Sequence, residues 1–203
     1  MTMAAKIDLY KEHRGEYVTP KEPVFVSIGP ANYLTIAGQG SPKGKKFEAA
    51  VGALYSVAFT LKMAEKAAGH DYKVCHLEGQ WWTEGDGNWQ TIKPEEWRWR
   101  LLIRVPEFVD EKKVWLAVGQ VIAKGKGGEL VDQVKLEKLE EGRCVQVLHV
   151  GPYSAEKTTL DKMGELTKTK GLHFRGPHHE IYLSDPRRVP EARLRTILRH
   201  PVQ

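Results

Sequence analysis

A glutamate stands in the middle of an apolar and aromatic segment near the C-terminal end of the sequence. Glu180 lies between His179 and Ile181, although acidic residues are disfavoured within β-strands. Side chains alternate between the two faces of a strand, so Glu180 is expected to share a face with His178 and Tyr182. A carboxylate on such a face can attract a cation, or it can take a proton from water as a general base. The ordinary alternative is a solvent-facing acid that pairs with a nearby arginine.

A second acid, Glu78, is the other candidate for catalysis. It belongs to a predicted strand over residues 73–82, where alternation places it on one face with His76 and Trp82. The alternative is a structural acid at the end of the strand, because Gly79 follows it directly.

Tryptophan is the residue in excess in this sequence. The chain contains six, and five of them fall between positions 81 and 99. Tryptophan is enriched where flat ligands or partners bind, since its ring offers a large apolar face and one polar N–H group. Tyr153 follows a predicted strand and either lies at the mouth of a cleft or packs in a turn. The side chains predicted to contact a ligand are Trp81, Trp82, Trp99, Tyr153, Tyr182, His178, His76 and Tyr33.

The histidines and cysteines give no pattern typical of a metal site. Adjacent strand residues point to opposite faces, so His178 and His179 cannot readily chelate one ion together. We therefore expect no metal and no other cofactor. The two cysteines, Cys75 and Cys144, are predicted to be core thiols. Two isolated cysteines indicate a reducing compartment, and we expect a cytoplasmic protein.

The net charge of +5 is spread over a mixed surface. Basic residues are interleaved with 26 acids and form no block beyond residues 43–46, which favours a solvated surface over a nucleic-acid partner. No apolar run approaches the roughly 20 residues of a membrane span, so no membrane partner is expected.

The elements that must position these side chains occur twice in the same order. Each copy begins with a bent strand, continues with an amphipathic helix that a glycine ends, and closes with two strands. The first copy is predicted over residues 24–28 and 33–37, 47–61, 73–82 and 97–105. The second copy is predicted over residues 134–139 and 143–150, 156–170, 178–183 and 193–199. A bridging helix and a glycine-rich linker connect the copies.

Matching endings support this duplication. Residues 98–106 and 193–201 share three arginines and a closing proline, and Gly40 corresponds to Gly151. The predicted class is α+β, with tandem strand–helix–strand–strand modules related by pseudo-twofold symmetry and antiparallel sheets around a central cleft. Clefts between modules are preferred small-molecule sites, and Glu180 is expected to face this one.

The predicted domain covers residues 22–203 and follows a polar lead-in over residues 1–21. Its modules are residues 22–106 and 130–203. Strand alternation also assigns the repeated arginines to a solvated sheet face. These are Arg98, Arg100, Arg104, Arg193, Arg195 and Arg199.

Four segments together resemble the GyrI-like small-molecule-binding family. They are residues 77–82, 148–153, 178–188 and 196–202. The resemblance implies the tandem fold and a ligand cleft between the modules. It also implies flat, lipophilic and often cationic ligands, held by aromatic side chains and a buried glutamate that corresponds to Glu180. The family includes multidrug-sensing domains of transcription activators. The sequence has no helix-turn-helix extension and so resembles the stand-alone branch.

The predicted function is the binding of a hydrophobic or cationic aromatic small molecule, with Glu180 and Glu78 supplying negative charge. Some stand-alone members are implied to be hydrolases that open the strained cyclopropane of DNA-alkylating compounds, which would make Glu180 a general base. Two alternatives stay open from the sequence, a non-catalytic sequestering protein and an inhibitor of a DNA-processing enzyme. The oligomeric state is not predicted.

Overall fold

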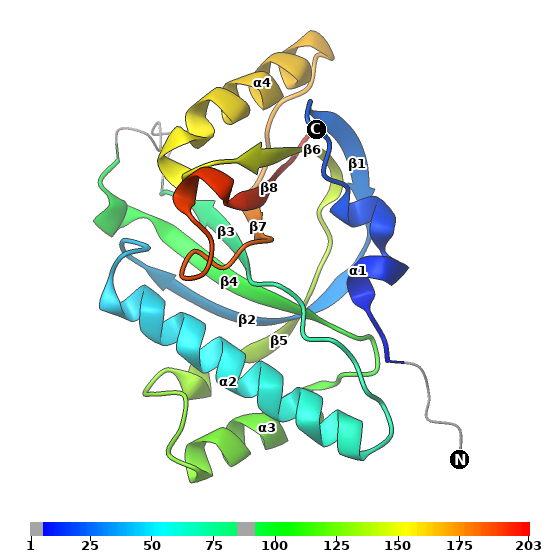
Figure 1. Ribbon diagram of the computed structural model, residues 1–203, viewed down its shortest axis with the longest axis vertical. Coiled ribbons are helices and arrows are strands. Elements are labelled where there is room, and N and C mark those ends of the chain that lie inside the picture. The colour runs from blue at the N-terminus through cyan, green and yellow to red at the C-terminus, as the bar shows by residue number, and fades with distance from the viewer. Residues whose placement is uncertain (1–5, 85–91) are drawn as a thin grey trace. The chain divides into compact units, whose positions relative to one another are not determined.

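The computed structural model describes residues 6–84 and 92–203 of the 203-residue chain. It divides into two compact units (Figure 1). The first unit contains Met1–Glu12, Ala31–Cys75 and Trp81–Leu139, and the second contains His13–Pro30, His76–Gln80 and Glu140–Gln203.

The first unit is built on three antiparallel strands in the order β4-β2-β5. The central strand β2 (Ala31–Gln39) pairs with β4 (Arg98–Val105) on one side and with β5 (Lys135–Leu139) on the other. Leu34 is fully buried and lies opposite Ile103 and Leu136. The helices of this unit are α1 (Leu9–Glu12), η2 (Pro94–Glu96), α2 (Lys45–Ala67), α3 (Glu111–Ala123) and η3 (Val131–Gln133).

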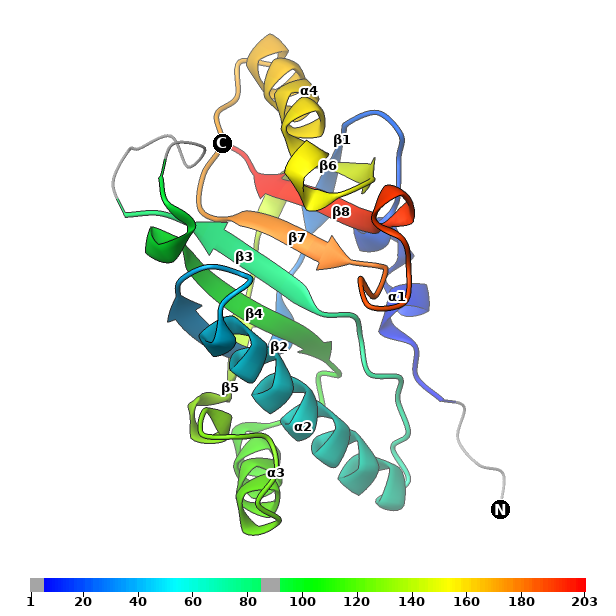
Figure 2. The same cartoon turned by 60° about the vertical axis from the view of Figure 1, so that its left-hand side comes forward.

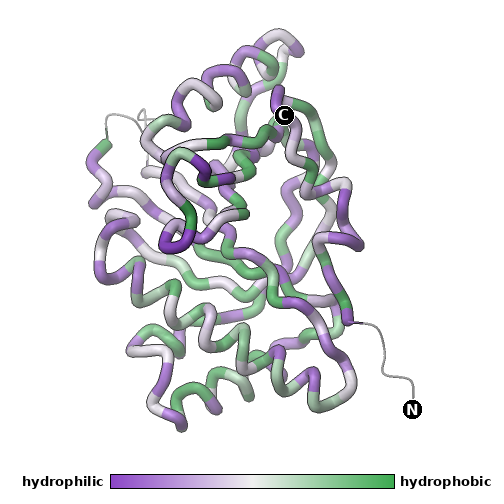
Figure 3. Tube along the Cα trace, in the orientation of Figure 1, coloured by the Kyte–Doolittle hydropathy of each residue, from purple (hydrophilic) through white to green (hydrophobic). Residues whose placement is uncertain are grey.

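The long helix α2 packs on this sheet. Both ribbon views show it beside β2 and β4, with which it is in contact (Figures 1 and 2). Apolar and polar positions interleave along it (Figure 3), and Leu54, Val57 and Leu61 are buried, as the predicted stripe requires. The helix is long and apolar enough to cross a membrane by length and composition alone, although polar residues interrupt its apolar positions. Its buried stripe is typical of a core helix.

The second unit is built on four antiparallel strands in the order β1-β6-β8-β7. They are β1 (Val24–Ile28), β6 (Gly142–Val150), β8 (Arg195–Pro201) and β7 (His178–Tyr182). Helix α4 (Glu156–Thr169) packs on β6, and Met163 joins Val145, Val147 and Leu198 in the core. Short helices η1 (Arg14–Tyr17), η4 (Tyr153–Ala155) and η5 (Glu191–Arg193) complete the unit. Strand β3 (Glu78–Trp82) begins in this unit and ends in the first.

The order of elements confirms the α+β class and the tandem strand–helix–strand–strand pattern, with α3 between the copies. Each bent strand is split between the units, because β1 pairs with β6 and β5 pairs with β2. The strand predicted from residue 73 begins only at Glu78, and Tyr72 makes an isolated bridge to Ile7. The superposition of residues 22–106 on 130–203 and the cleft between modules stay predictions.

The two glycines that the repeat matched are equivalent in local structure. The Gly40 amide donates to the Trp97 carbonyl at 2.9 Å, and the Gly151 amide donates to the Leu194 carbonyl at 3.0 Å. Both glycines have positive φ, at 122° and 136°, which other residues rarely adopt. Trp97 therefore corresponds to Leu194, so the matched arginines Arg98 and Arg193 are two positions out of register.

The prediction that all the repeated arginines face solvent is wrong for two of them. Arg104 and Arg199 are buried, with exposed fractions of 3% and 0%. Arg199 lies beneath the segment around η1, where its guanidinium donates to the Glu16 carbonyl and lies 5.8 Å from the Tyr17 ring. Alternation correctly separates the two faces of β8, but it does not show that a distant segment covers one of them.

Candidate functional site

Strand β7 presents Glu180 on its more exposed face. Burial alternates along the strand: His179 and Ile181 are buried, and the other three residues are partly exposed. Glu180 thus shares a face with His178 and Tyr182, as the alternation predicted. Its side chain is 13% exposed, and its Oε1 atom lies 3.6 Å from Nε2 of His178.

A third acidic or imidazole side chain, Glu156, joins these two. It is the first residue of α4, is 5% exposed, and has a buried Oε1 atom without a hydrogen-bond partner. Glu156, His178 and Glu180 each offer an atom, and these atoms lie within 4.8 Å of one another. Both ring nitrogens of His178 are buried without a hydrogen-bond partner. Buried polar side chains gathered in one place with so few internal partners are typical of a functional site.

The two carboxyl groups repel each other when both are charged. Burial, and then the charge of Glu180, raises the pKa of Glu156 to about 10. An acid in the first turn of a helix is ordinarily stabilised in its charged form by the helix dipole. Here desolvation and the neighbouring carboxylate outweigh that effect.

Two tyrosine rings lie beside the acids. Tyr153 and Tyr182 meet edge to face, with ring centroids 5.9 Å apart and an interplanar angle of 86°. Burial, then the charges of Glu180 and Glu156, raises the pKa of Tyr153 to about 12. Because Tyr153 is still 39% exposed, its ring is accessible to a ligand. This arrangement offers negative charge and flat apolar surface together, which suits an aromatic cation.

The opposite face of β7 carries a buried ionic network. His179 is 1% exposed and lies between Glu141, 2.9 Å from Nδ1, and Glu78, 3.0 Å from Nε2. The contact with Glu78 is an ion pair whose geometry does not make a hydrogen bond. Arg199 donates to Glu141 at 3.0 Å and to Gln146 at 2.7 Å. The charged side chains on this face of β7 are therefore paired with one another.

The charges of this network hold one another in the ionised state. Burial opposes ionisation of Glu141, but His179 and Arg199 lower its pKa to about 2. Burial likewise opposes protonation of His179, but Glu141 and Glu78 raise its pKa to about 9. Each buried ion is stabilised by its partners. Removing one partner would therefore leave a buried charge whose desolvation is no longer compensated.

Glu78 is wholly buried, with the Tyr17 hydroxyl donating to it at 3.3 Å and His179 beside it. Glu78 begins strand β3 rather than ending a strand, and its catalytic role stays a prediction. His76 is partly buried in the same unit.

The predicted tryptophans and Tyr33 belong to the first unit. The Trp81 ring stacks on the Phe47 ring, with centroids 5.5 Å apart, and meets the Trp97 ring edge-on, with centroids 6.2 Å apart. Trp82 is partly buried. Trp99 and Tyr33 are core side chains, 0% and 3% exposed. Trp89 lies outside the described residues. The acid pair Glu156 and Glu180 and the tyrosine pair Tyr153 and Tyr182, by contrast, belong to the second unit.

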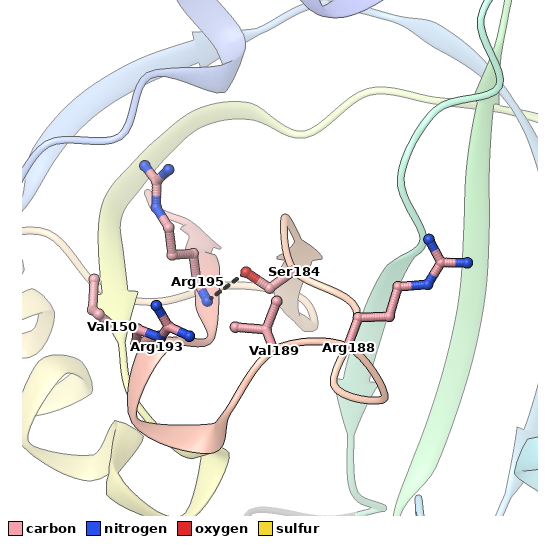
Figure 4. Close-up of a pocket in the computed structure, with 6 residues that line it drawn as sticks. All are labelled: Val150, Ser184, Arg188, Val189, Arg193 and Arg195. Atoms are coloured by element: carbon pink, nitrogen blue, oxygen red, sulfur yellow. Dashed lines mark hydrogen bonds between the residues drawn. The ribbon is translucent and has the colours of Figure 1, made fainter.

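An open hollow of about 490 Å³ lies elsewhere in the second unit (Figure 4). Its lining residues are Val150, Ser184, Arg188, Val189, Arg193 and Arg195. None of the predicted site residues lines it. The three guanidinium groups are exposed and point in different directions in Figure 4, so they do not converge on an anion.

The sequence singled out neither Glu156 nor Glu141, and it wrongly assigned Arg199 to a solvated face. Glu156 has the sequence context of an ordinary first-turn acid, and Glu141 stands between two predicted strands, directly before Gly142. The available signal for Glu156 was its place three residues after Tyr153, at the start of a helix that follows a strand.

An acid pair beside one exposed and one partly buried tyrosine ring is a site suited to a small molecule. Residues 21–203 match the GyrI-like small molecule binding domain, and the chain belongs to this family. None of the curated proteins compared with the chain matches it significantly.

Solved structures similar to this chain support the assignment. An uncharacterized conserved protein from Listeria innocua is 38% identical, with a TM-score of 0.90, over 98% of this chain and 100% of that one. A hydrolase encoded by lin2189 from Listeria innocua is 35% identical, with a TM-score of 0.88 and the same coverage. The EcmrR C-terminal domain is 10% identical, with a TM-score of 0.61 over 90% of this chain and 97% of that one, and shares the fold.

Proposed function

We propose that the protein binds flat, lipophilic or cationic small molecules beside Glu180 and hydrolyses strained electrophilic members of this class. The observation that carries the proposal is the Glu180 carboxylate, which lies beside the tyrosine pair Tyr153 and Tyr182 and an unpartnered buried acid. Family membership supports small-molecule binding. The similar Listeria protein described as a hydrolase supports turnover.

The proposed reaction opens a cyclopropane ring that is conjugated to a carbonyl group. Glu180 takes a proton from a water molecule while the water oxygen attacks a ring carbon. The new carbon–oxygen bond forms as a ring carbon–carbon bond breaks, and the electron pair of that bond passes into the conjugated carbonyl group. Tyr153 and Tyr182 hold the flat substrate so that the ring carbon faces the water. Once the oxygen of that carbonyl group has taken up a proton, the product is the substrate plus one water.

Incubation of the purified protein with a cyclopropane-bearing dienone tests the proposal. Mass spectrometry should detect a product heavier by one water, and Glu180→Gln should abolish its formation. Glu165→Gln is the matched control, because Glu165 is an exposed acid on α4. Tight binding without any product would leave a sequestering protein as the function. Equal turnover by Glu180→Gln would remove Glu180 as the base.

A further inference from the structure

We infer that Glu156 is a second catalytic residue, which carries a proton beside the ionised Glu180 and gives it to the substrate during ring opening. This inference rests on the proposed hydrolytic function and adds the proton donor that the reaction requires. The geometry that supports it is the close approach of the two side chains, whose atoms lie with those of His178 within 4.8 Å.

The burial of Glu156 disfavours the charged form of its carboxyl group. The residue is 5% exposed, and its Oε1 atom is buried without a hydrogen-bond partner. No lysine or arginine is found in an ion pair with it among the residues that the structure describes. A buried carboxylate without such a partner is strongly disfavoured, whereas a protonated carboxyl group is not.

The other titratable groups around the pair are His178, Tyr153 and Asp185. The charge of Asp185 contributes to the raised pKa of Tyr153, and Asp185 itself forms ion pairs with Arg187 and Arg188. The Tyr153 pKa of about 12 keeps the phenol protonated wherever Glu156 titrates. Burial and the charge of Glu180 raise the pKa of Glu156 to about 10. The pair therefore holds one proton and one negative charge near neutral pH, as two like carboxylates sharing a site do.

The proton on Glu156 closes the chemical balance of the reaction. Glu180 receives a proton from the attacking water, and the electron pair of the broken carbon–carbon bond reaches the carbonyl oxygen of the substrate. Glu156 gives its proton to that oxygen, which becomes a hydroxyl group. Glu180 then returns its newly gained proton to Glu156 through one bridging water molecule, which can span side-chain atoms that lie within 4.8 Å of one another. Both acids regain their starting states, and one water has been consumed.

The pH–rate profile of Glu156→Gln tests the inference. Glutamine keeps the shape and neutrality of the protonated acid but cannot donate its proton. We expect kcat to fall about 100- to 10,000-fold, the usual contribution of a general acid. The activity of the unaltered enzyme should decline in alkaline buffer as Glu156 loses its proton, and this decline should be absent from the residual activity of Glu156→Gln. Affinity for a dye cation and the melting temperature should stay near those of the unaltered protein, as they should in the Glu165→Gln control.

Infrared spectroscopy gives a second readout, independent of turnover and of the folding of any variant. The unaltered protein should show the carbonyl band of a buried protonated carboxyl group at neutral pH, and the band should disappear as the pH rises through about 10. Absence of this band at neutral pH overturns the inference, as does unchanged kcat in Glu156→Gln. Activity that a chelator abolishes and zinc restores would assign the three side chains to a metal ion and would also overturn it. If the unaltered protein hydrolyses nothing, the proposed function fails; if it does and Glu156→Gln equals it, only the present inference fails.

Discussion

Replacement of His179 by glutamine should destabilise the protein in a pH-dependent way. The imidazolium lies between Glu141 and Glu78 and is fully buried. Against the opposing effect of burial, these two carboxylates raise its pKa from the ordinary 6.5 to about 9. That pKa difference of about 2.5 corresponds to about 3 kcal/mol of folding free energy at 1.36 kcal/mol per pKa unit.

The sign of the effect follows from proton linkage. Because the folded pKa is raised, this stabilisation is complete below pH 6.5 and is lost as the pH rises toward 9. Glu156 contributes a slope of the same sign over this window, since its folded pKa is raised as well. The His179→Gln variant keeps the Glu156 contribution, which therefore cancels from the stability difference between the two proteins.

Urea unfolding at a series of pH values between 6 and 9 measures both effects. At pH 6 the variant should be less stable than the unaltered protein by about 3–5 kcal/mol, the range for breaking a buried ion pair. The gap should narrow by up to about 3 kcal/mol as the pH approaches 9. A gap that stays constant over the series would show that His179 is not charged in the folded state, and the reasoning would be refuted.

Three further outcomes are expected. Glu180→Gln should keep or raise the melting temperature, because it removes a partly desolvated charge, and should weaken binding of a lipophilic dye cation by about 1–3 kcal/mol in calorimetry; unfolding or unchanged affinity would return Glu180 to a structural role. Dye binding by the unaltered protein should weaken only modestly when salt is raised to about 1 M, because the contact is mostly apolar, whereas a steep loss would indicate a charged surface site. Gly38→Ala should cost about 1–3 kcal/mol of stability, since the new Cβ would lie 2.4 Å from the buried Trp99 ring. Gly52→Ala on α2 has open space at this position and should be neutral or stabilising in the same thermal melts.

The family and the order of elements were predictable from the sequence because each depends on local or repeated patterns. The apolar stripe of α2 depends on helical periodicity, and the faces of β7 depend on strand alternation. Glu180 stood out because an acid is unusual in an apolar strand. These signals use only the spacing of residue types along the chain, so they survive without tertiary information.

What covers each face was decided only by the tertiary structure. Arg199 follows the same alternation as an exposed arginine, but the segment around η1 buries it, and this segment had been predicted as a polar lead-in. Glu156 has the sequence context of an ordinary helix-start acid, and it becomes a candidate proton donor only because packing removes water and brings Glu180 close. Periodicity determines which side chains share a face, whereas desolvation and the approach of distant charges depend on which segments fold over that face.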